Sequence, residues 1–391
     1  MAKAFTISSG LNAWPAEGRA GALAAATLVT VTAASGQPVA PQPLLSTTLQ
    51  GGDGDDVLVA SQAAVTETLF GNDGNDTLFG QDRDRLYGGS GADLLYGGGE
   101  NGGGLYGGAG DDAIIAEGGL ASGPTLGFPG VRVEGGDGND TILNWNGGVN
   151  AYGGAGDDRF EVPPDSGDFP AISAGYEMSF HGGDGDDVVR VNPHETLSWH
   201  GSAYIYGDSG NDDIAIDSTW GHLAFGGAGN DRIFVREGEL VGDAGDDQLF
   251  GGDGRNNLYG GAGTDSLFGG AGQDRLSGGQ GGDLLYGGAG ADVFVADAST
   301  DRTGRADRVM DLDVAAGDRI NLTQLLGNMS GVDLIAEGFV RATAVTIDGT
   351  SYAAIEVDRD GAAGKGAFQQ ALLVRTDDPL ALNDQEFWTF G

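Results

Sequence analysis

Aspartate recurs at one fixed place in a nine-residue repeat that runs through most of the chain. Residues 51–59 read "GGDGDDVLV", residues 135–143 read "GGDGNDTIL" and residues 226–234 read "GGAGNDRIF". Glycine occupies the first, second and fourth places of these copies, aspartate the sixth and an apolar residue the eighth. The sixth-position aspartates of the clear copies are Asp56, Asp76, Asp93, Asp112, Asp140, Asp158, Asp187, Asp212, Asp231, Asp247, Asp265, Asp274, Asp283 and Asp292, and the one substitution is Asn256.

This combination of residues could bind a divalent cation. Carboxylate and carbonyl oxygens are hard ligands, and Ca²⁺ takes about six to eight of them at about 2.3–2.6 Å in a flexible geometry. Mg²⁺ suits such a cage less well because it demands a near-ideal octahedron. Glycine accepts positive φ and so lets backbone carbonyls crowd together in a turn. The repeat therefore predicts calcium sites, provided that the fold brings successive turns together.

The elements that must position these ligands are a turn and a short strand. The three residues around the eighth position read as an extended segment that points one side chain inward. Each repeat is then half a coil, two repeats make a rung of about 18 residues, and rungs stack at about 4.8 Å. The eighth-position residues would form a thin apolar ladder inside the coil: Leu58, Leu78, Leu95, Ile114, Ile142, Phe160, Val189, Ile214, Ile233, Leu249, Leu258, Leu267, Leu276, Leu285 and Phe294.

The repeat resembles the calcium-binding nonapeptide of RTX proteins, the hemolysin-type repeat. The resemblance covers residues 51–295 and implies an all-β fold, a right-handed parallel β-roll with calcium-bound turns. It also implies that Ca²⁺ lies between neighbouring turns, held by the sixth-position aspartates and by backbone carbonyls, roughly a dozen ions or more. The carbonyl candidates are Gly52, Gly54, Gly136, Gly138, Gly183, Gly185, Gly227, Gly229, Gly261, Gly263, Gly279 and Gly281.

Composition agrees with a fold that cations order. The 391 residues include 76 glycines and no cysteine, so neither a thick apolar core nor disulfides are expected to stabilise the chain. The formal net charge of −39 disfavours a compact state unless cations neutralise it, and it excludes nucleic acid and anionic membranes as partners. The one long apolar run, residues 20–34, is too short to span a bilayer, and a cleaved signal peptide there is left open.

The spacing of the copies predicts an uneven coil. Clear copies begin about one full rung apart between residues 51 and 242, and every nine residues from residue 242 to residue 287. One edge of the coil should therefore carry repeat turns throughout. The opposite edge should carry degenerate or inserted turns, such as "DRDRLY", and become a calcium edge only near its end.

The irregular turns hold many aromatic residues and all the histidines. These residues are Trp145, Tyr152, Phe169, Tyr176, Phe180, Trp199, Tyr204, Tyr206, Trp220, Phe225, His181, His194, His200 and His222. Three interpretations stay open: the aromatic residues cover the core at widened turns, they form an interaction face, or the histidines bind a transition metal.

The two ends differ from the repeats. Residues 296–391 resemble the C-terminal target domain of type I secretion, through the run Asp307, Asp311 and Asp313, the "GDRINL" segment and the expected strands "RATAVTID", "YAAIEVD" and "ALLVRT". This domain would cap the roll. Residues 1–50 show no repeat, and "TLVTVTA" reads as a strand that either caps its own roll or adds to a neighbouring copy.

The chain shows no assembled catalytic motif. "HETLSWH" is not HExxH, and "GDSGN" at residues 207–211 has the register of a repeat turn. We therefore expect a non-enzymatic structural protein that folds on Ca²⁺ and self-associates, without inserting into a membrane. The resemblance to RTX proteins implies that it is secreted to the cell surface and meets this Ca²⁺ outside the cell. The alternatives are a calcium-dependent adhesin that recognises a glycan or host surface through aromatic loops, and a small hydrolase.

Overall fold

The computed structural model describes residues 48–61, 66–81, 83–99, 103–118, 131–146, 148–163, 177–191, 202–218, 221–296, 305–327, 333–359, 361, 368–376, 382 and 388–389. The strand predicted by "TLVTVTA" lies outside these residues. The described chain falls into two compact units that divide between Met178 and Ser179. One short helix, α2 (Thr323–Leu326), accompanies the strands, and no helix among the described residues is long and apolar enough to cross a membrane.

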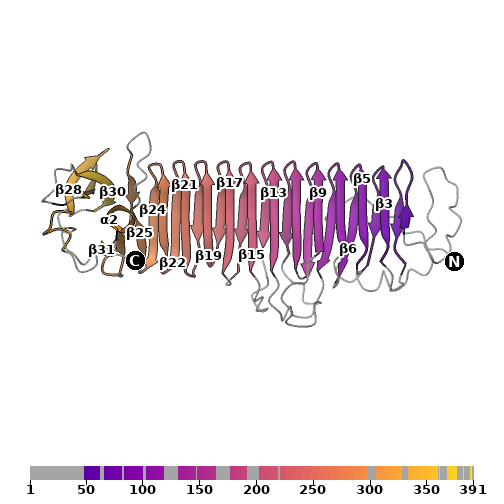
Figure 1. The fold of residues 1–391 in the computed structure, drawn as a ribbon, viewed down its shortest axis with the longest axis horizontal. Helices are drawn as coiled ribbons and strands as arrows, with labels where there is room; N and C mark the ends of the chain where they lie inside the picture. The colour runs from indigo at the N-terminus through magenta and orange to yellow at the C-terminus, as the bar shows by residue number, and fades with distance from the viewer. Residues whose placement is uncertain are drawn as a thin grey trace. The chain divides into compact units, whose positions relative to one another are not determined.

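The first unit consists of two sheets whose strands alternate along the chain. Its first sheet has the order β1 (Thr48–Gln50), β3 (Thr68–Asp73), β5 (Arg85–Ser90), β7 (Gly104–Ala109), β9 (Val131–Asp137) and β11 (Val149–Ala155). Its second sheet has the order β2 (Val57–Val59), β4 (Thr77–Phe79), β6 (Leu94–Gly99), β8 (Ala113–Gly118), β10 (Thr141–Asn146) and β12 (Arg159–Val162). Neighbouring strands pair in parallel, so each rung of the coil contributes one strand to each sheet (Figure 1).

The second unit repeats this plan. Its first sheet contains β13 (Met178–Asp184), β15 (Ala203–Ser209), β17 (His222–Ala228), β19 (Gly238–Ala244), β21 (Asn256–Ala262), β23 (Arg275–Gln280), β25 (Val293–Val295), β27 (Arg319–Asn321) and β31 (Trp388–Thr389). Its second sheet contains β14 (Val188–Val191), β16 (Asp213–Ile216), β18 (Arg232–Val235), β20 (Gln248–Gly251), β22 (Ser266–Gly272), β24 (Leu284–Gly290), β26 (Asp307–Val309), β30 (Gln369–Arg375), β29 (Thr350–Val357) and β28 (Val340–Ile347). The all-β parallel roll that the repeat predicts is confirmed.

The predicted asymmetry of the turns is also present. We call the turns that lead from the first sheet to the second the first edge, and the returning turns the second edge. In the first unit, the clear copies that begin at residues 51, 71, 88, 107, 135 and 153 all form first-edge turns. In the second unit, the copies at 182, 207, 226, 242, 260 and 278 lie on the first edge, and those at 251, 269 and 287 lie on the second.

The eighth-position residues form the interior of each unit. All of them are at most 1% exposed, from Leu58 to Phe294. The strand register stacks them directly, as in Leu249, Leu267 and Leu285 of successive rungs. Where second-edge turns depart from the repeat, the returning strand still places one or two apolar side chains inward, such as Leu86 in β5 or Val131 and Val133 in β9. Each strand therefore contributes only one or two apolar side chains to a thin core, as the low apolar content requires.

The three strands expected near the C-terminus are present as β28, β29 and β30. They pair antiparallel with one another, and β30 pairs in parallel with β26. Tyr352, Ala354 and Leu373 form a buried cluster there, with Met310 packed against it. The parallel pairing continues past residue 295, because β26 and β27 add to β24 and β25. The assignment of residues 296–391 to a separate target domain stays a prediction.

Candidate metal centre

The sixth-position aspartates form a hydrogen-bonded ladder along the first edge. The backbone N–H of Asp76 donates to Oδ1 of Asp93 at 2.7 Å, and the N–H of Asp93 donates to Oδ1 of Asp112 at 2.8 Å. In the second unit the same bond joins Asp187 to Asp212 and continues through Asp231, Asp247, Asp265 and Asp283. Each carboxylate thus satisfies the backbone of the rung before it.

In ten of the sixth-position carboxylates, Oδ2 has no donor. In Asp76, Asp93, Asp112, Asp140, Asp212, Asp231, Asp247, Asp265, Asp274 and Asp292, atom Oδ2 is buried and accepts no hydrogen bond. A buried carboxylate oxygen without a partner is costly, so the oxygen requires a proton or a cation. Its orientation is the same from rung to rung because Oδ1 is fixed by the ladder.

The orphan oxygen lies beside backbone carbonyls of the next turn. A Cβ added to Gly135 would lie 2.1 Å from Oδ2 of Asp140 and 2.6 Å from the carbonyl oxygen of Gly153. Likewise, a Cβ added to Gly107 would lie 2.1 Å from Oδ2 of Asp112 and 2.6 Å from the carbonyl oxygen of Gly135. Only glycine leaves this space open, and the space is lined by carboxylate and carbonyl oxygens. The donor set is the one that Ca²⁺ prefers.

The second and fourth glycines bring further carbonyls close. Gly136 has φ of +126°, and a Cβ there would lie 2.0 Å from the carbonyl oxygen of Gly108 on the preceding rung. Of the predicted ligands, Gly136, Gly138, Gly183, Gly185, Gly227, Gly229, Gly261, Gly263, Gly279 and Gly281 share this left-handed backbone. Asn72, Asp208 and Asp243 replace the second glycine elsewhere with φ between 71° and 82°, a conformation that these residue types tolerate.

The first turn differs from the others. Gly52 and Gly54 are absent from the left-handed positions, and Oδ2 of Asp56 accepts the N–H of Gly52 at 2.6 Å. The orphan oxygen of this carboxylate is instead Oδ1, which is buried and accepts no hydrogen bond. The assignment of Asp56, Gly52 and Gly54 as calcium ligands stays a prediction.

Burial raises the pKa of the ladder carboxylates. The pKa of Asp112 rises to about 7 and that of Asp93 to about 6, because desolvation outweighs the hydrogen bond from the preceding rung. The pKa of Asp158 and Asp265 rises to about 7 for the same reason. Ionised carboxylates in these positions destabilise the roll at neutral pH unless a cation lies beside them.

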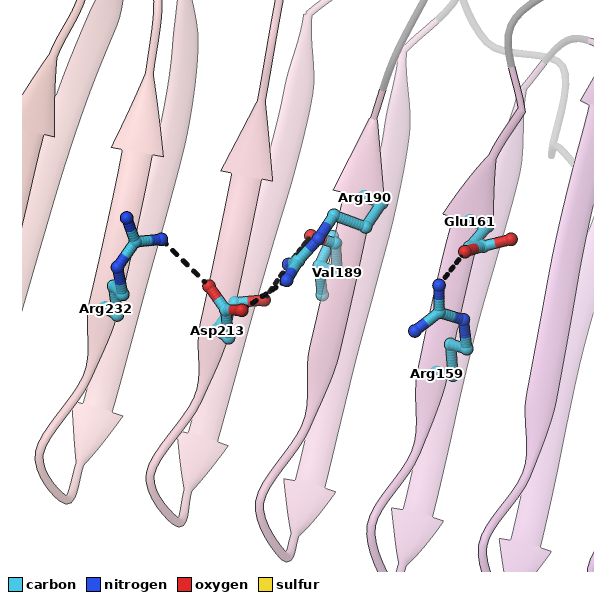
Figure 2. Close-up of polar contacts among 6 residues, drawn as sticks. All are labelled: Arg159, Glu161, Val189, Arg190, Asp213 and Arg232. Atoms are coloured by element: carbon cyan, nitrogen blue, oxygen red, sulfur yellow. Dashed lines mark hydrogen bonds and ion pairs between the residues drawn. The ribbon is translucent and has the colours of Figure 1, made fainter.

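The arginines of the sheet faces do not supply this charge. In the second unit Arg190 and Arg232 both contact the carboxylate of Asp213, and Arg232 Nη1 lies 3.5 Å from Oδ1 (Figure 2). In the first unit Arg159 pairs with Glu161 of the same strand. These pairs lie on the strands and use carboxylates outside the sixth position. These three arginines therefore neutralise none of the sixth-position carboxylates.

The structure adds members to the ladder that the repeat count missed. Asp307 extends the first-edge ladder by accepting the N–H of Asp283 at 3.1 Å. The second edge carries a ladder of the same kind, in which Asp84 accepts the N–H of Glu67 at 2.7 Å and Asp318 that of Asp292 at 2.9 Å. Each precedes an inward apolar residue by two places, in "DRL", "DRV" and "DRI", and this triplet is the signal that could have identified them. His222 also belongs, because its Nδ1 accepts the Ala203 N–H at 3.1 Å, and no sequence signal marks it.

A second, exposed ladder involves the fifth position. The N–H of Asn139 donates to Oδ1 of Asp111 at 2.9 Å, and the N–H of Asp157 donates to Oδ1 of Asn139 at 2.8 Å. These bonds run from each rung to the one before it, opposite to the sixth-position ladder. The recurrence of Asp and Asn in "GDD" and "GND" is the signal for this pair of ladders.

The residues of the irregular turns are described only in part. Phe180 and His222 are fully buried, which agrees with a role in covering the core. Tyr206 stacks between His181 and Phe225, with ring centroids 4.4 and 5.0 Å away. The side chain of Trp145 and residues Phe169, Tyr176, His194, Trp199, His200 and Trp220 lie outside the described residues. The interaction face and the transition-metal site stay predictions.

Comparison with known proteins identifies the repeat. The family model of the RTX calcium-binding nonapeptide repeat matches residues 46–63, 66–82, 70–102, 105–119, 132–148, 223–239, 241–276 and 268–302. The chain is therefore an RTX repeat protein. Its repeats are of the calcium-binding type, and the carboxylate and carbonyl oxygens described above fit that ion. The described residues contain no cluster of three His, Cys, Asp or Glu side chains that could hold a metal ion.

Other comparisons add little to this RTX assignment. No curated protein matches the chain. Among solved structures, the chain is similar to the solution structure of the AlgE6R3 subunit from the Azotobacter vinelandii mannuronan C5-epimerase. The two are 33% identical over 38% of this chain and 80% of that chain, with a TM-score of 0.29. This TM-score is too low for the likeness to inform the function of the RTX protein.

Proposed function

We propose that this RTX protein is a secreted, non-enzymatic structural protein that folds when Ca²⁺ fills its turns outside the cell. The low calcium concentration of the cytosol would leave the carboxylates unneutralised, and the charge of −39 would keep the chain unfolded before export. Extracellular modules bind Ca²⁺ with dissociation constants of about 10⁻⁴ to 10⁻³ M, which sets the switch between the two compartments. The typical secretion of RTX proteins supports this proposal.

One observation carries the proposal, the row of buried Oδ2 atoms beside glycine carbonyls. Each such atom raises the cost of the ion-free fold and offers a ligand to a cation. In the second unit alone these atoms belong to Asp212, Asp231, Asp247, Asp265, Asp274 and Asp292. Because the thin core supplies little apolar burial per rung, cations at these atoms would decide whether the roll forms.

Circular dichroism during a Ca²⁺ titration tests the folding step. The protein in excess chelator should show little strand signal, and strand signal should develop cooperatively as Ca²⁺ approaches the millimolar range. Mg²⁺ at the same concentration serves as the control and should produce a smaller change. Strand signal already complete in chelator would overturn the proposal.

We also propose export by a type I system through residues 296–391, and assembly of the folded protein into a surface layer, filament or matrix. Assembly is favoured over glycan adhesion by the outward aromatic residues of the second unit. Phe250, Phe268 and Tyr286 stack with ring centroids 5.0 and 4.8 Å apart, so both faces of Phe268 and one face of each neighbouring ring are closed to a sugar.

Electron microscopy with and without Ca²⁺ tests assembly, and isolated monomers in millimolar Ca²⁺ would contradict it. Alanine replacement of Trp145, Trp199 and Trp220 separates assembly from adhesion. Loss of assembly would make these loops an interface between copies. Loss of glycan retention with assembly intact would make them an adhesive face.

A further inference from the structure

At one position of the second edge, asparagine replaces the ladder aspartate but keeps the hydrogen bonds of the ladder. Asn256 is fully buried, and its N–H donates to Oδ1 of Asp274 at 2.8 Å. Its own Oδ1 accepts the N–H of Gly238 at 3.0 Å. Asn256 therefore makes the same two ladder bonds as a sixth-position aspartate.

The second side-chain atom of Asn256 lies where the orphan oxygen lies in other turns. A Cβ added to Gly251 would be 2.7 Å from Nδ2 of Asn256 and 2.1 Å from the carbonyl oxygen of Gly269. In the next turn, a Cβ on Gly269 would be 2.7 Å from Oδ2 of Asp274 and 2.6 Å from the carbonyl oxygen of Gly287. The same place thus holds an acceptor in one turn and an N–H donor in the other.

The amide nitrogen satisfies the carbonyls that would otherwise face a cation. Nδ2 of Asn256 donates to the carbonyl oxygens of Gly254 at 3.0 Å and of Arg236 at 3.4 Å. An amide NH₂ has two donors and no lone pair for a metal, so a cation and this group exclude each other. The fifth residue of this turn is positively charged: Arg255, whose Nη2 donates to Oε1 of Gln273 at 3.0 Å.

The backbone of this turn differs as well. Gly270 and Gly272, the second and fourth residues of the Asp274 turn, have φ of +101° and +137°. The corresponding residues of the Asn256 turn, Gly252 and Gly254, are absent from the left-handed positions. The carbonyl arrangement of a repeat turn is therefore not reproduced around Asn256.

Two other turns of the second edge also satisfy the second side-chain atom from within the protein. Oδ2 of Asp84 accepts the N–H of Gln81 at 2.8 Å, and Oδ2 of Asp318 accepts the N–H of Asp313 at 2.7 Å. Only Asp274 and Asp292, among the described sixth-position side chains of this edge, have an Oδ2 without a donor. The turns of this edge thus fall into two kinds.

We infer that Asn256 makes its turn independent of calcium, with the amide nitrogen in the place of the ion. We also infer that, among the second-edge turns that the structure describes, only those of Asp274 and Asp292 bind Ca²⁺. The inference rests on the proposed calcium binding. The two calcium-binding turns, those of Asp274 and Asp292, would then lie between two turns without calcium, those of Asn256 and Asp318. The rungs around Asn256 would hold their second-edge turns without metal.

The number of Ca²⁺ ions bound per full-length chain tests the inference, measured by equilibrium dialysis and elemental analysis. Asn256→Asp should bind one ion more than the wild type and fold at a higher Ca²⁺ concentration, because it introduces a buried carboxylate. Asp274→Asn, the matched reverse change in the next turn, should bind one ion fewer. An unchanged ion count in a folded Asn256→Asp protein would overturn the inference.

Asn256→Ala keeps the test decisive if Asn256→Asp does not fold. The alanine variant should bind as many ions as the wild type, because no ion depends on the amide. One ion fewer would show that the Asn256 oxygen is a ligand, which overturns the inference. Failure of the proposed function is distinct, since the wild type itself would then bind no Ca²⁺.

Discussion

Replacing Asp247 with asparagine would remove one oxygen ligand from the first edge and change little else. Oδ1 of Asp247 accepts the N–H of Asp231 at 2.8 Å, and an asparagine oxygen can keep that bond. Oδ2 is the orphan atom, and a Cβ on Gly242 would lie 2.2 Å from it and 2.4 Å from the carbonyl oxygen of Gly260. Asn256 shows that the ladder accommodates the amide in the same orientation.

The magnitude follows from the linkage between ion binding and folding. An ion present at ten to a hundred times its dissociation constant contributes about 1.4 to 2.7 kcal/mol to the free energy of unfolding. The new amide would donate a hydrogen bond to a turn carbonyl, which adds about 0.5 to 1.5 kcal/mol to the free energy of unfolding. Asp247→Asn should therefore lose one bound ion and about 1 kcal/mol of stability in saturating Ca²⁺.

Urea unfolding at fixed Ca²⁺, followed by circular dichroism, measures the stability, and dialysis measures the ion count. The matched control is Asp246→Asn in the same turn. Asp246 is exposed and its Oδ1 accepts the Thr264 N–H at 2.7 Å, a bond that asparagine can also make. Both variants lose one negative charge. Equal ion counts and equal stabilities in the two variants would refute the reasoning, because net charge alone would then explain the effect.

Three further predictions concern the roll itself. Leu258→Ala, between Leu240 and Leu276 in the core, should cost about 3 kcal/mol of unfolding free energy in urea melts. Gly261→Ala should cost at least about 2 kcal/mol, because φ is +116° and the new Cβ would lie 2.1 Å from a backbone oxygen, whereas Gly221→Ala, with open space around it, should cost under about 0.5 kcal/mol. Burial lowers the pKa of His222 from 6.5 to about 4, so the unfolded state takes up a proton more readily than the folded state. The free energy of unfolding should therefore fall by up to about 3 kcal/mol as pH falls from about 6.5 to about 4. His222→Gln should remove that part of the pH dependence, and identical pH profiles for the two proteins would contradict the assignment.

The sequence by itself determined the repeating parts of the structure. A residue at a fixed place in a periodic repeat must occupy the same place in every rung, so Asp140 and Ile142 could be assigned to a turn and to the core without coordinates. The spacing of the copies also gave the uneven distribution of turns between the two edges. The strands β28 to β30 followed from their alternating apolar pattern.

Only the tertiary structure decided what each side-chain atom does. The ladder joins residues 16 to 28 positions apart on the first edge, and the turn lengths vary, so counting positions missed Asp84, Asp307 and Asp318. In the sequence, Asn256 looks like a conservative replacement of the sixth-position aspartate. In the structure, its amide nitrogen is a donor at the place where Asp274 has an orphan oxygen. The physical reason is that hydrogen bonds and ion sites depend on which atoms of neighbouring rungs meet. Composition and periodicity specify the rungs, and stacking specifies the contacts between them.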